Sequence, residues 1–214
     1  MSSFHIRQIS RSAIFMFAVC MSPLAIASSD TSQVNFDNGS GSVEFHATGH
    51  PSALKIVGKG MSPKGSFTMK GKVVSGSAHF ELTSLDTGID MRTRHMKEKY
   101  LEVQKFPEAT LTLTKMELPQ DFSGDTSFSQ VPFIGKLSLH GVEHVVTGTA
   151  DVSRHGNQAT VSANFGLKIA DYAIALPNFA GITMADDVQI AVQSTAPVTD
   201  VVVKPAIGRP TASR

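Results

Sequence analysis

Cysteine, tryptophan and charge are all scarce in this chain of 214 residues. Its one cysteine is Cys20, tryptophan is absent, and charged residues make up 17%. The bulky Val19 before Cys20 argues against a lipoprotein signal, which requires a small residue there. Residues 28–214 contain no cysteine, so a domain folded from them forms neither disulfides nor thiolate metal sites. The stability of that domain must come from a hydrophobic core. The chain is long enough for one domain with such a core.

The first 27 residues have the pattern of a secretory signal peptide. Arg7 and Arg11 give a positive start, an apolar run follows over 13–20, and the tripeptide Ala-Ile-Ala at 25–27 matches a cleavage site. The apolar run is too short to span a bilayer, and Pro23 interrupts its extension. We therefore expect cleavage after residue 27, a periplasmic or secreted protein, and no stable membrane insertion.

The charge balance does not indicate a nucleic acid partner. Without Arg7 and Arg11, the chain keeps 17 basic residues against 18 acidic ones, a net charge of −1. Domains that bind nucleic acid usually carry a marked positive excess, often clustered on one face. We expect no nucleic acid partner.

Most of the remaining chain alternates apolar and polar residues with a period of two. This period is typical of half-buried strands, and it is clearest over 161–169. We expect about eight strands, with a polar loop over 119–130 and a last strand over 188–192. The sequence thus predicts an all-β fold: an eight-stranded antiparallel sheet closed on itself into a barrel. The predicted organisation is a signal peptide (1–27), a leader (28–42), the barrel domain (43–196) and a disordered tail (197–214).

One short helix is expected to interrupt the strands near residues 93–102. Gly88 loosens the chain before it, and Pro107 is expected to end it, because proline disfavours helical backbone in the residue before it. Positive side chains on this segment suggest a basic rim near an opening, where an anionic head group could bind. A plain solvated face is the alternative. The rim residues are Arg92, Arg94, Lys97 and Lys99.

The segment from His140 to His144 matches the zinc motif H-x-x-E-H letter for letter. Zinc binding by this motif requires both histidines on one helical face. Here the motif lies between two alternating stretches and contains Gly-Val, which favours a solvated hairpin turn. We therefore expect no metal site and dispensable histidines. Sequence motifs for nucleophilic catalysis, phosphate loops and dinucleotide binding are absent, so no catalytic residues are predicted.

The apolar residues of the alternating stretches are the candidates for the interior of the barrel. Alternation alone leaves open whether they fill a packed core or line a ligand cavity. The candidates are Phe45, Phe67, Phe80, Leu82, Leu111, Leu113, Leu137, Leu139, Phe165 and Leu167.

Four stretches occur in an order that is informative about family. They are SVEFHATGHPSALKIVGKG (42–60); SLDTG, R-x-R-H-M, Y-L and K-F-P-E-A-T-L (within 84–111); GKLSLHGVEHVV (135–146); and FGLKIADYAI with DDVQIAVQSTA (within 165–196). Together they resemble the YceI-like family over about residues 43–196. The resemblance implies a periplasmic, lipocalin-like barrel that holds a long isoprenoid chain.

The resemblance therefore favours a ligand cavity over a packed core. The expected function is non-catalytic binding or carriage of a long-chain isoprenoid or similar amphiphile, such as a polyprenyl chain or a quinone tail, without a cofactor. Each CH₂ withdrawn from water contributes roughly 0.8 kcal/mol, so such a ligand needs few polar contacts. Two alternatives remain: an enzyme acting on a lipid-like substrate, and a stress-related structural or chaperone-like protein with a packed core.

Overall fold

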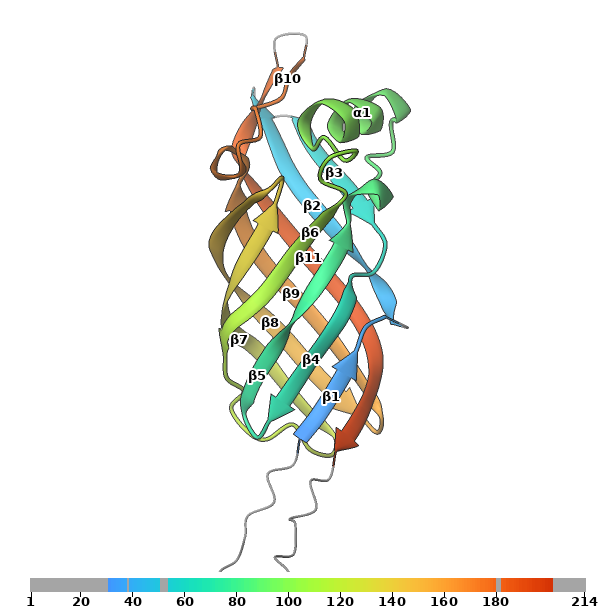
Figure 1. Cartoon of the computed structure of the whole chain (residues 1–214), viewed down its shortest axis with the longest axis vertical. Coiled ribbons are helices and arrows are strands. Elements are labelled where there is room, and N and C mark those ends of the chain that lie inside the picture. The colour runs from blue at the N-terminus through green and yellow to red at the C-terminus, as the bar shows by residue number, and fades with distance from the viewer. Residues whose placement is uncertain (1–30, 38, 51–53, 180–181, 202–214) are drawn as a thin grey trace, which may run out of the picture.

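The computed structural model describes residues 31–37, 39–50, 54–179 and 182–201, which are mostly antiparallel strand (Figure 1). The strands are β1 (Thr31–Asn35), β2 (Ser40–His50), β3 (Leu54–Gly60), β4 (Lys64–Lys70), β5 (Val73–Glu81), β6 (Glu108–Met116), β7 (Thr126–Leu139), β8 (Val142–His155), β9 (Gln158–Lys168), β10 (Asn178–Phe179) and β11 (Ile182–Val201). The helical segments are the 3-10 turns η1 (Leu82–Ser84) and η3 (Ile169–Tyr172), the helix α1 (Asp90–His95) and the π-helical segment η2 (Met96–Tyr100). None of these helices in the described chain is long and apolar enough to cross a membrane.

The strands close into a barrel with eight positions in its wall. Six positions are single strands, β5, β6, β7, β8, β9 and β11, paired in that order. The other two are each shared by consecutive strands, because β1 continues as β2 and β3 continues as β4. At the lower end in Figure 1, β11 pairs with β1 and β1 with β4; at the upper end, β11 pairs with β2 and β2 with β3. The predicted eight-stranded antiparallel barrel with one short helix is confirmed.

The upper end of the wall is joined through a narrow seam. There β3 meets the chain that follows η1, rather than a full neighbouring strand. The amide of Lys59 donates to the carbonyl of Asp86, and the amide of Asp86 donates back to the carbonyl of Lys59, both at 2.8 Å. This reciprocal pair completes the ring directly below α1.

Bulges in the strands shift the alternation of inward and outward side chains. In β7 the register shifts between Phe128 and Val131, so these residues, three apart, are both buried. Gln130 at this bulge has φ 54°, and its amide donates to the carboxylate of Asp151 at 2.7 Å. The predicted loop over 119–130 is therefore wrong in its last five residues, because β7 already begins at Thr126.

The described strands extend beyond the predicted barrel domain at both ends. β1 lies within the predicted leader (28–42), and β11 runs through the predicted strand 188–192 and on to Val201, inside the predicted tail. Both segments belong to the wall, because β1 pairs with β11 over Thr31–Val34. The predicted signal peptide and residues 202–214 lie outside the described residues.

The short helix occupies the predicted region but ends for a different reason. The helical run begins at Asp90 and ends at Tyr100. Glu102 then adopts the left-handed region with φ 45°, and the amide of Val103 donates to the carbonyl of Lys97 at 3.0 Å. This is a Schellman-type closure, which terminates a helix without proline. Pro107 is therefore not the residue that ends it.

Candidate functional site: an apolar cavity in the barrel

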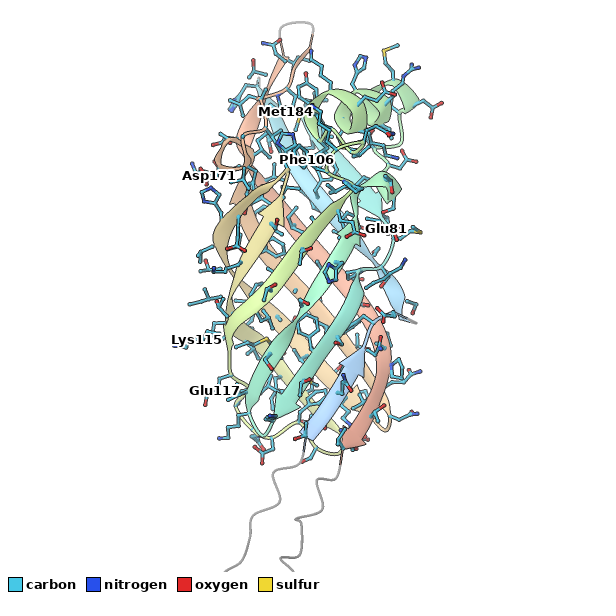
Figure 2. All side chains as sticks on the ribbon, viewed as in Figure 1. Glu81, Phe106, Lys115, Glu117, Asp171 and Met184 are labelled. Atoms are coloured by element: carbon cyan, nitrogen blue, oxygen red, sulfur yellow. The ribbon has the colours of Figure 1, made fainter. Side chains whose placement is uncertain are left out.

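The barrel interior contains a cavity of about 690 Å³. It reaches from Leu118 and Phe122, near the lower end, to the segment around α1 at the upper end. Phe106 and Met184 lie toward the upper end and Lys115 and Glu117 toward the lower end (Figure 2). All ten interior candidates from the sequence line this cavity: Phe45, Phe67, Phe80, Leu82, Leu111, Leu113, Leu137, Leu139, Phe165 and Leu167.

Aromatic and aliphatic side chains form most of the cavity wall. Phe133 and Phe165, for example, meet edge to face with ring centroids 6.1 Å apart, and both are buried. Seven lining residues have polar side chains: Thr87, Arg92, His95, Lys99, Tyr100, Asn178 and Ser194. Within the described chain, none of the lining residues has a carboxylate or a thiol. The wall therefore offers mainly hydrocarbon surface.

The cavity opens at the upper end and is closed at the lower end. The lining residues with exposed side chains all belong to the region of α1, η2 and β10: Ile89, Met91, His95, Lys99 and Asn178. At the lower end, by contrast, Val34, Leu118 and Ala159 are at most 2% exposed. α1 and β10 stand at the same end of the barrel (Figure 1), so they frame one mouth.

The stretch SLDTG builds the mouth by turning the chain from the wall into α1. The carboxylate of Asp86 accepts hydrogen bonds from the amide of Gly88 at 2.8 Å and the hydroxyl of Thr93 at 3.0 Å. These bonds lower the pKa of Asp86. Gly88 has φ 76°, which favours glycine. Thr93 also accepts a hydrogen bond from the amide of Thr87 at 3.0 Å, so the start of α1 is fixed to the wall.

Arg92 is the most constrained cation at the mouth. Its Nη2 donates to the carbonyl of Thr87 at 2.5 Å, whereas its buried Nε has no hydrogen-bond partner. Of the four predicted rim residues, Arg92 and Lys99 line the cavity, while Arg94 and Lys97 lie on the same segment away from it. The mouth therefore contains a cavity-lining guanidinium with one buried N–H that lacks a partner, and binding of an oxygen-containing head group there remains a prediction.

His140 is not solvated, which corrects the expectation for the H-x-x-E-H segment. Residues 140–141 do form the β7–β8 hairpin turn, with φ 53° and 77°. However, the His140 side chain is only 10% exposed. Its Nε2 lies 3.1 Å from the carboxylate of Glu102, its Nδ1 lies 3.1 Å from the carbonyl of Tyr172, and its ring packs on Phe106. His140 thus ties together three segments below the mouth.

His144 lies apart from His140, on the outer surface of β8. It is exposed and contacts the ring of Tyr172 edge to face at 5.3 Å. Burial raises the pKa of the Tyr172 hydroxyl, which has no hydrogen-bond partner, to about 12. Among the described residues, no three His, Cys, Asp or Glu side chains are grouped closely enough to hold a metal ion. The segment therefore contributes packing contacts, and nothing in its geometry resembles the zinc site of the motif.

Solved structures with the same architecture include two barrels of similar size. One is a polyisoprenoid binding domain from Saccharophagus degradans, described as implicated in plant cell wall breakdown, with a TM-score of 0.59 and 17% identity over 78% of this chain and 98% of that chain. The other is BcnA from Burkholderia cenocepacia, with a TM-score of 0.58 and 16% identity over 76% of this chain and 99% of that chain. At these identities the likeness demonstrates a shared fold.

Sequence comparison assigns the family. A UPF0312 protein from Yersinia enterocolitica is 34% identical over 98 residues, which are 42% of this chain and 47% of that protein. The match therefore spans about half the length of that curated relative. The family model for the YceI-like domain matches residues 27–196, which include most of the described barrel and its cavity. The chain belongs to the YceI-like family.

Proposed function

We propose that this protein binds and carries a long-chain isoprenoid or similar amphiphilic lipid, without converting it chemically. The observation that carries the proposal is the cavity of about 690 Å³, closed below, open above, and lined mainly by hydrocarbon. Burial of a five-carbon isoprene unit contributes roughly 4 kcal/mol before the costs of association, so a chain of several units binds without many polar contacts. The polyisoprenoid-binding description of the Saccharophagus relative supports this ligand class.

The distribution of polar groups supports carriage rather than catalysis. General acid–base or nucleophilic catalysis requires polar groups that converge on a reacting atom. Ser194 is the one polar lining residue remote from the mouth, and its hydroxyl is hydrogen-bonded to the hydroxyl of Ser62 at 3.0 Å. The remaining polar lining residues lie around the mouth, where a ligand's head would be. A quinone or phosphorylated polyprenol both combine an apolar tail with an oxygen-rich head of this kind.

We further propose that the protein works in the periplasm or outside the cell. The support is the N-terminal segment, with Arg7 and Arg11, an apolar run and the Ala-Ile-Ala tripeptide at 25–27. Mass spectrometry of the exported protein should give a chain that starts at Ser28. An uncleaved N-terminus, or an acyl group on Cys20, would contradict this proposal.

Extraction of the purified protein with organic solvent, followed by mass spectrometry, tests the ligand. A matched pair of variants sharpens the test. Ala163→Phe adds a ring to the cavity wall, whereas Ala191 lies on the neighbouring strand between two lining residues and does not itself line the cavity. We expect a co-purifying isoprenoid in the parent and in Ala191→Phe, and its loss in Ala163→Phe. Turnover of an added lipid would favour the enzyme instead, and absence of any ligand would favour an empty structural barrel.

A further inference from the structure

The mouth of the cavity is surrounded by exposed side chains of two kinds. Ile89 and Met91 on one side and Leu176 on the other are 54%, 53% and 44% exposed, although aliphatic side chains usually avoid water. Beside them, α1 and η2 carry Arg94 and Lys99, both exposed. We call these five residues the mouth face. Elements α1 and β10 place both kinds at the same end of the barrel (Figure 1).

The two chain segments that carry the mouth face differ in charge: one has a net positive charge, and the other has no charged residues. The segment 89–101 contains four Lys or Arg residues against Asp90 and Glu98, whereas 173–185 contains no charged residue at all. Among the described residues, neither Arg94 nor Lys99 has a carboxylate within ion-pair distance. On the barrel wall, by comparison, Lys64 pairs with Glu81 at 2.7 Å. Lys99 lies over the Tyr100 ring, 5.4 Å from its centroid, but neither Arg94 nor Lys99 is neutralised by a carboxylate, so both are available to an external anion.

We infer that the mouth face docks reversibly on an anionic lipid surface, with Ile89, Met91 and Leu176 in the head-group layer and Arg94 and Lys99 against lipid phosphates. Aliphatic side chains flanked by cations are the pattern of interfacial binding elements. The cavity opens within this face, so docking would let an apolar chain pass between the bilayer and the barrel without crossing water. The inference goes beyond the proposed function, which concerns only what the cavity holds.

The lower end of the barrel provides a matched control surface. Lys70, Lys72 and the 56% exposed Val73 gather at the β4–β5 turn, a composition similar to that of the mouth face. There, however, Val73 pairs with Glu117, and Asp121 lies beside Gly71, so acidic groups neighbour the cations. No cavity opening is found among the described residues of that end. A membrane surface should distinguish the two ends if the inference is correct.

The absence of tryptophan allows a direct optical test of docking. Met91→Trp and Val73→Trp each place a single tryptophan, at the mouth face and at the control surface. The full chain is mixed with phosphatidylcholine vesicles that contain or lack phosphatidylglycerol. We expect a blue shift for Met91→Trp only, and only with phosphatidylglycerol. The shift should vanish as ionic strength rises from about 0.01 M to about 1 M, where the Debye length falls from about 30 Å to about 3 Å.

Cosedimentation with the same vesicles measures the contribution of the cations. Each Lys or Arg near an anionic surface changes the partition coefficient about fivefold, so Arg94→Gln/Lys99→Gln should weaken binding about 30-fold. Ile89→Ser/Met91→Ser should also weaken binding, whereas Lys70→Gln/Lys72→Gln should not. Equal binding by all variants, or a shift for Met91→Trp that depends on protein concentration without vesicles, would overturn the inference. The second result would assign the face to self-association.

Ligand content, measured by extraction on the same preparations, separates this inference from the proposed function. A protein that contains an isoprenoid but never binds vesicles keeps the proposed function and overturns the docking inference. A protein that binds anionic vesicles through the mouth face but contains no lipid does the reverse.

Discussion

Arg154 on β8 and Asp200 at the end of β11 form a bidentate ion pair at the lower end of the barrel. Nη2 of Arg154 lies 2.6 Å from Oδ2 of Asp200, and Nη1 lies 2.8 Å from Oδ1. Arg154 also donates to the carbonyls of Phe122 and Gly156, and Asp200 accepts from the hydroxyl of Ser32 on β1. The Arg154 side chain is 7% exposed. The pair therefore links β8, β11, β1 and the loop that covers the closed end of the cavity.

We expect Asp200→Asn to lower the free energy of unfolding by about 1–2 kcal/mol, because it leaves the buried guanidinium of Arg154 without its anion. The estimate is kept small because Asp200 itself is 53% exposed and water screens the pair. Denaturant unfolding monitored by circular dichroism measures the change. Asp187→Asn is the control, because Asp187 pairs with Lys168 at 3.8 Å and both side chains are exposed. An equal loss in the control would contradict this account.

The contribution of Asp200 to stability should also depend on pH. Arg154 and the Ser32 hydroxyl hold the pKa of Asp200 at about 2, below its ordinary value of 3.8. A lowered pKa in the folded state means that the contribution is complete above the unfolded value and is lost as pH falls through the folded one. The difference in stability between the parent and Asp200→Asn should therefore be constant above about pH 5 and shrink toward pH 2. A difference in stability that persists undiminished at pH 2 would contradict this role for the ionised Asp200 carboxylate.

His140→Ala should destabilise the protein, even though the sequence predicts that both histidines are dispensable for metal and ligand binding. The substitution removes the contacts of the imidazole with Glu102, the Tyr172 carbonyl and the Phe106 ring. We expect a loss of about 1–3 kcal/mol in unfolding free energy, because the carbonyl of the buried Tyr172 loses its partner and the nearly buried imidazole loses its packing. His144→Ala, at an exposed site, is the matched control and should change stability by less than about 0.5 kcal/mol. Similar effects from both substitutions would refute the assignment.

Phe165→Gln should reduce ligand binding more than folding stability. An unpaired amide facing hydrocarbon costs about 1–3 kcal/mol, which corresponds to roughly 5- to 150-fold in affinity. Water can enter the unliganded cavity and solvate the amide. The free energy of unfolding should therefore fall less than the free energy of ligand binding, and the melting temperature should change little. Leu137→Gln should behave alike, and Val145→Gln, on the outer surface and 64% exposed, should change neither property. Large melting losses for both inner variants, with no ligand in the parent, would indicate a packed core.

Arg92→Met should discriminate between head groups. Arg92 lines the cavity and its Nε has no hydrogen-bond partner in the protein, and hydrogen bonds to charged groups contribute about 1.5–3 kcal/mol. We expect affinity for a polyprenyl phosphate to fall roughly 10- to 150-fold, and affinity for the unphosphorylated polyprenol to fall much less. Titration of the delipidated protein with both ligands measures the difference. An equal loss for both would mean that Arg92 only supports the fold through Thr87.

The period-two alternation was sufficient to predict the strands and the ten interior candidates, because strand geometry places every second residue on the same face, whereas the choice of a cavity over a packed core came from the family resemblance. It failed where the period breaks. The bulge at Gln130 depends on a hydrogen bond from its amide to Asp151, 21 residues away, which no local pattern indicates. The burial of His140 likewise depends on Glu102, 38 residues away. The sequence assigns 28–42 to a leader with at most one edge strand around Val34 to Phe36, and it does not indicate that β1 pairs with both β4 and β11 and so buries Val34.

The seam at Lys59 and Asp86 gives the two ends of the barrel different freedom to change circumference. At the lower end, where β1 closes the wall, β1 pairs along strand ladders with both β11 and β4, so closure there rests on a run of backbone pairings. At the upper end, β3 and the chain after η1 share one reciprocal pair of backbone hydrogen bonds. Parting of that pair would widen the mouth while the floor stays closed. The upper barrel could then widen to accommodate ligand tails of different thickness, while the depth of the cavity stays the same.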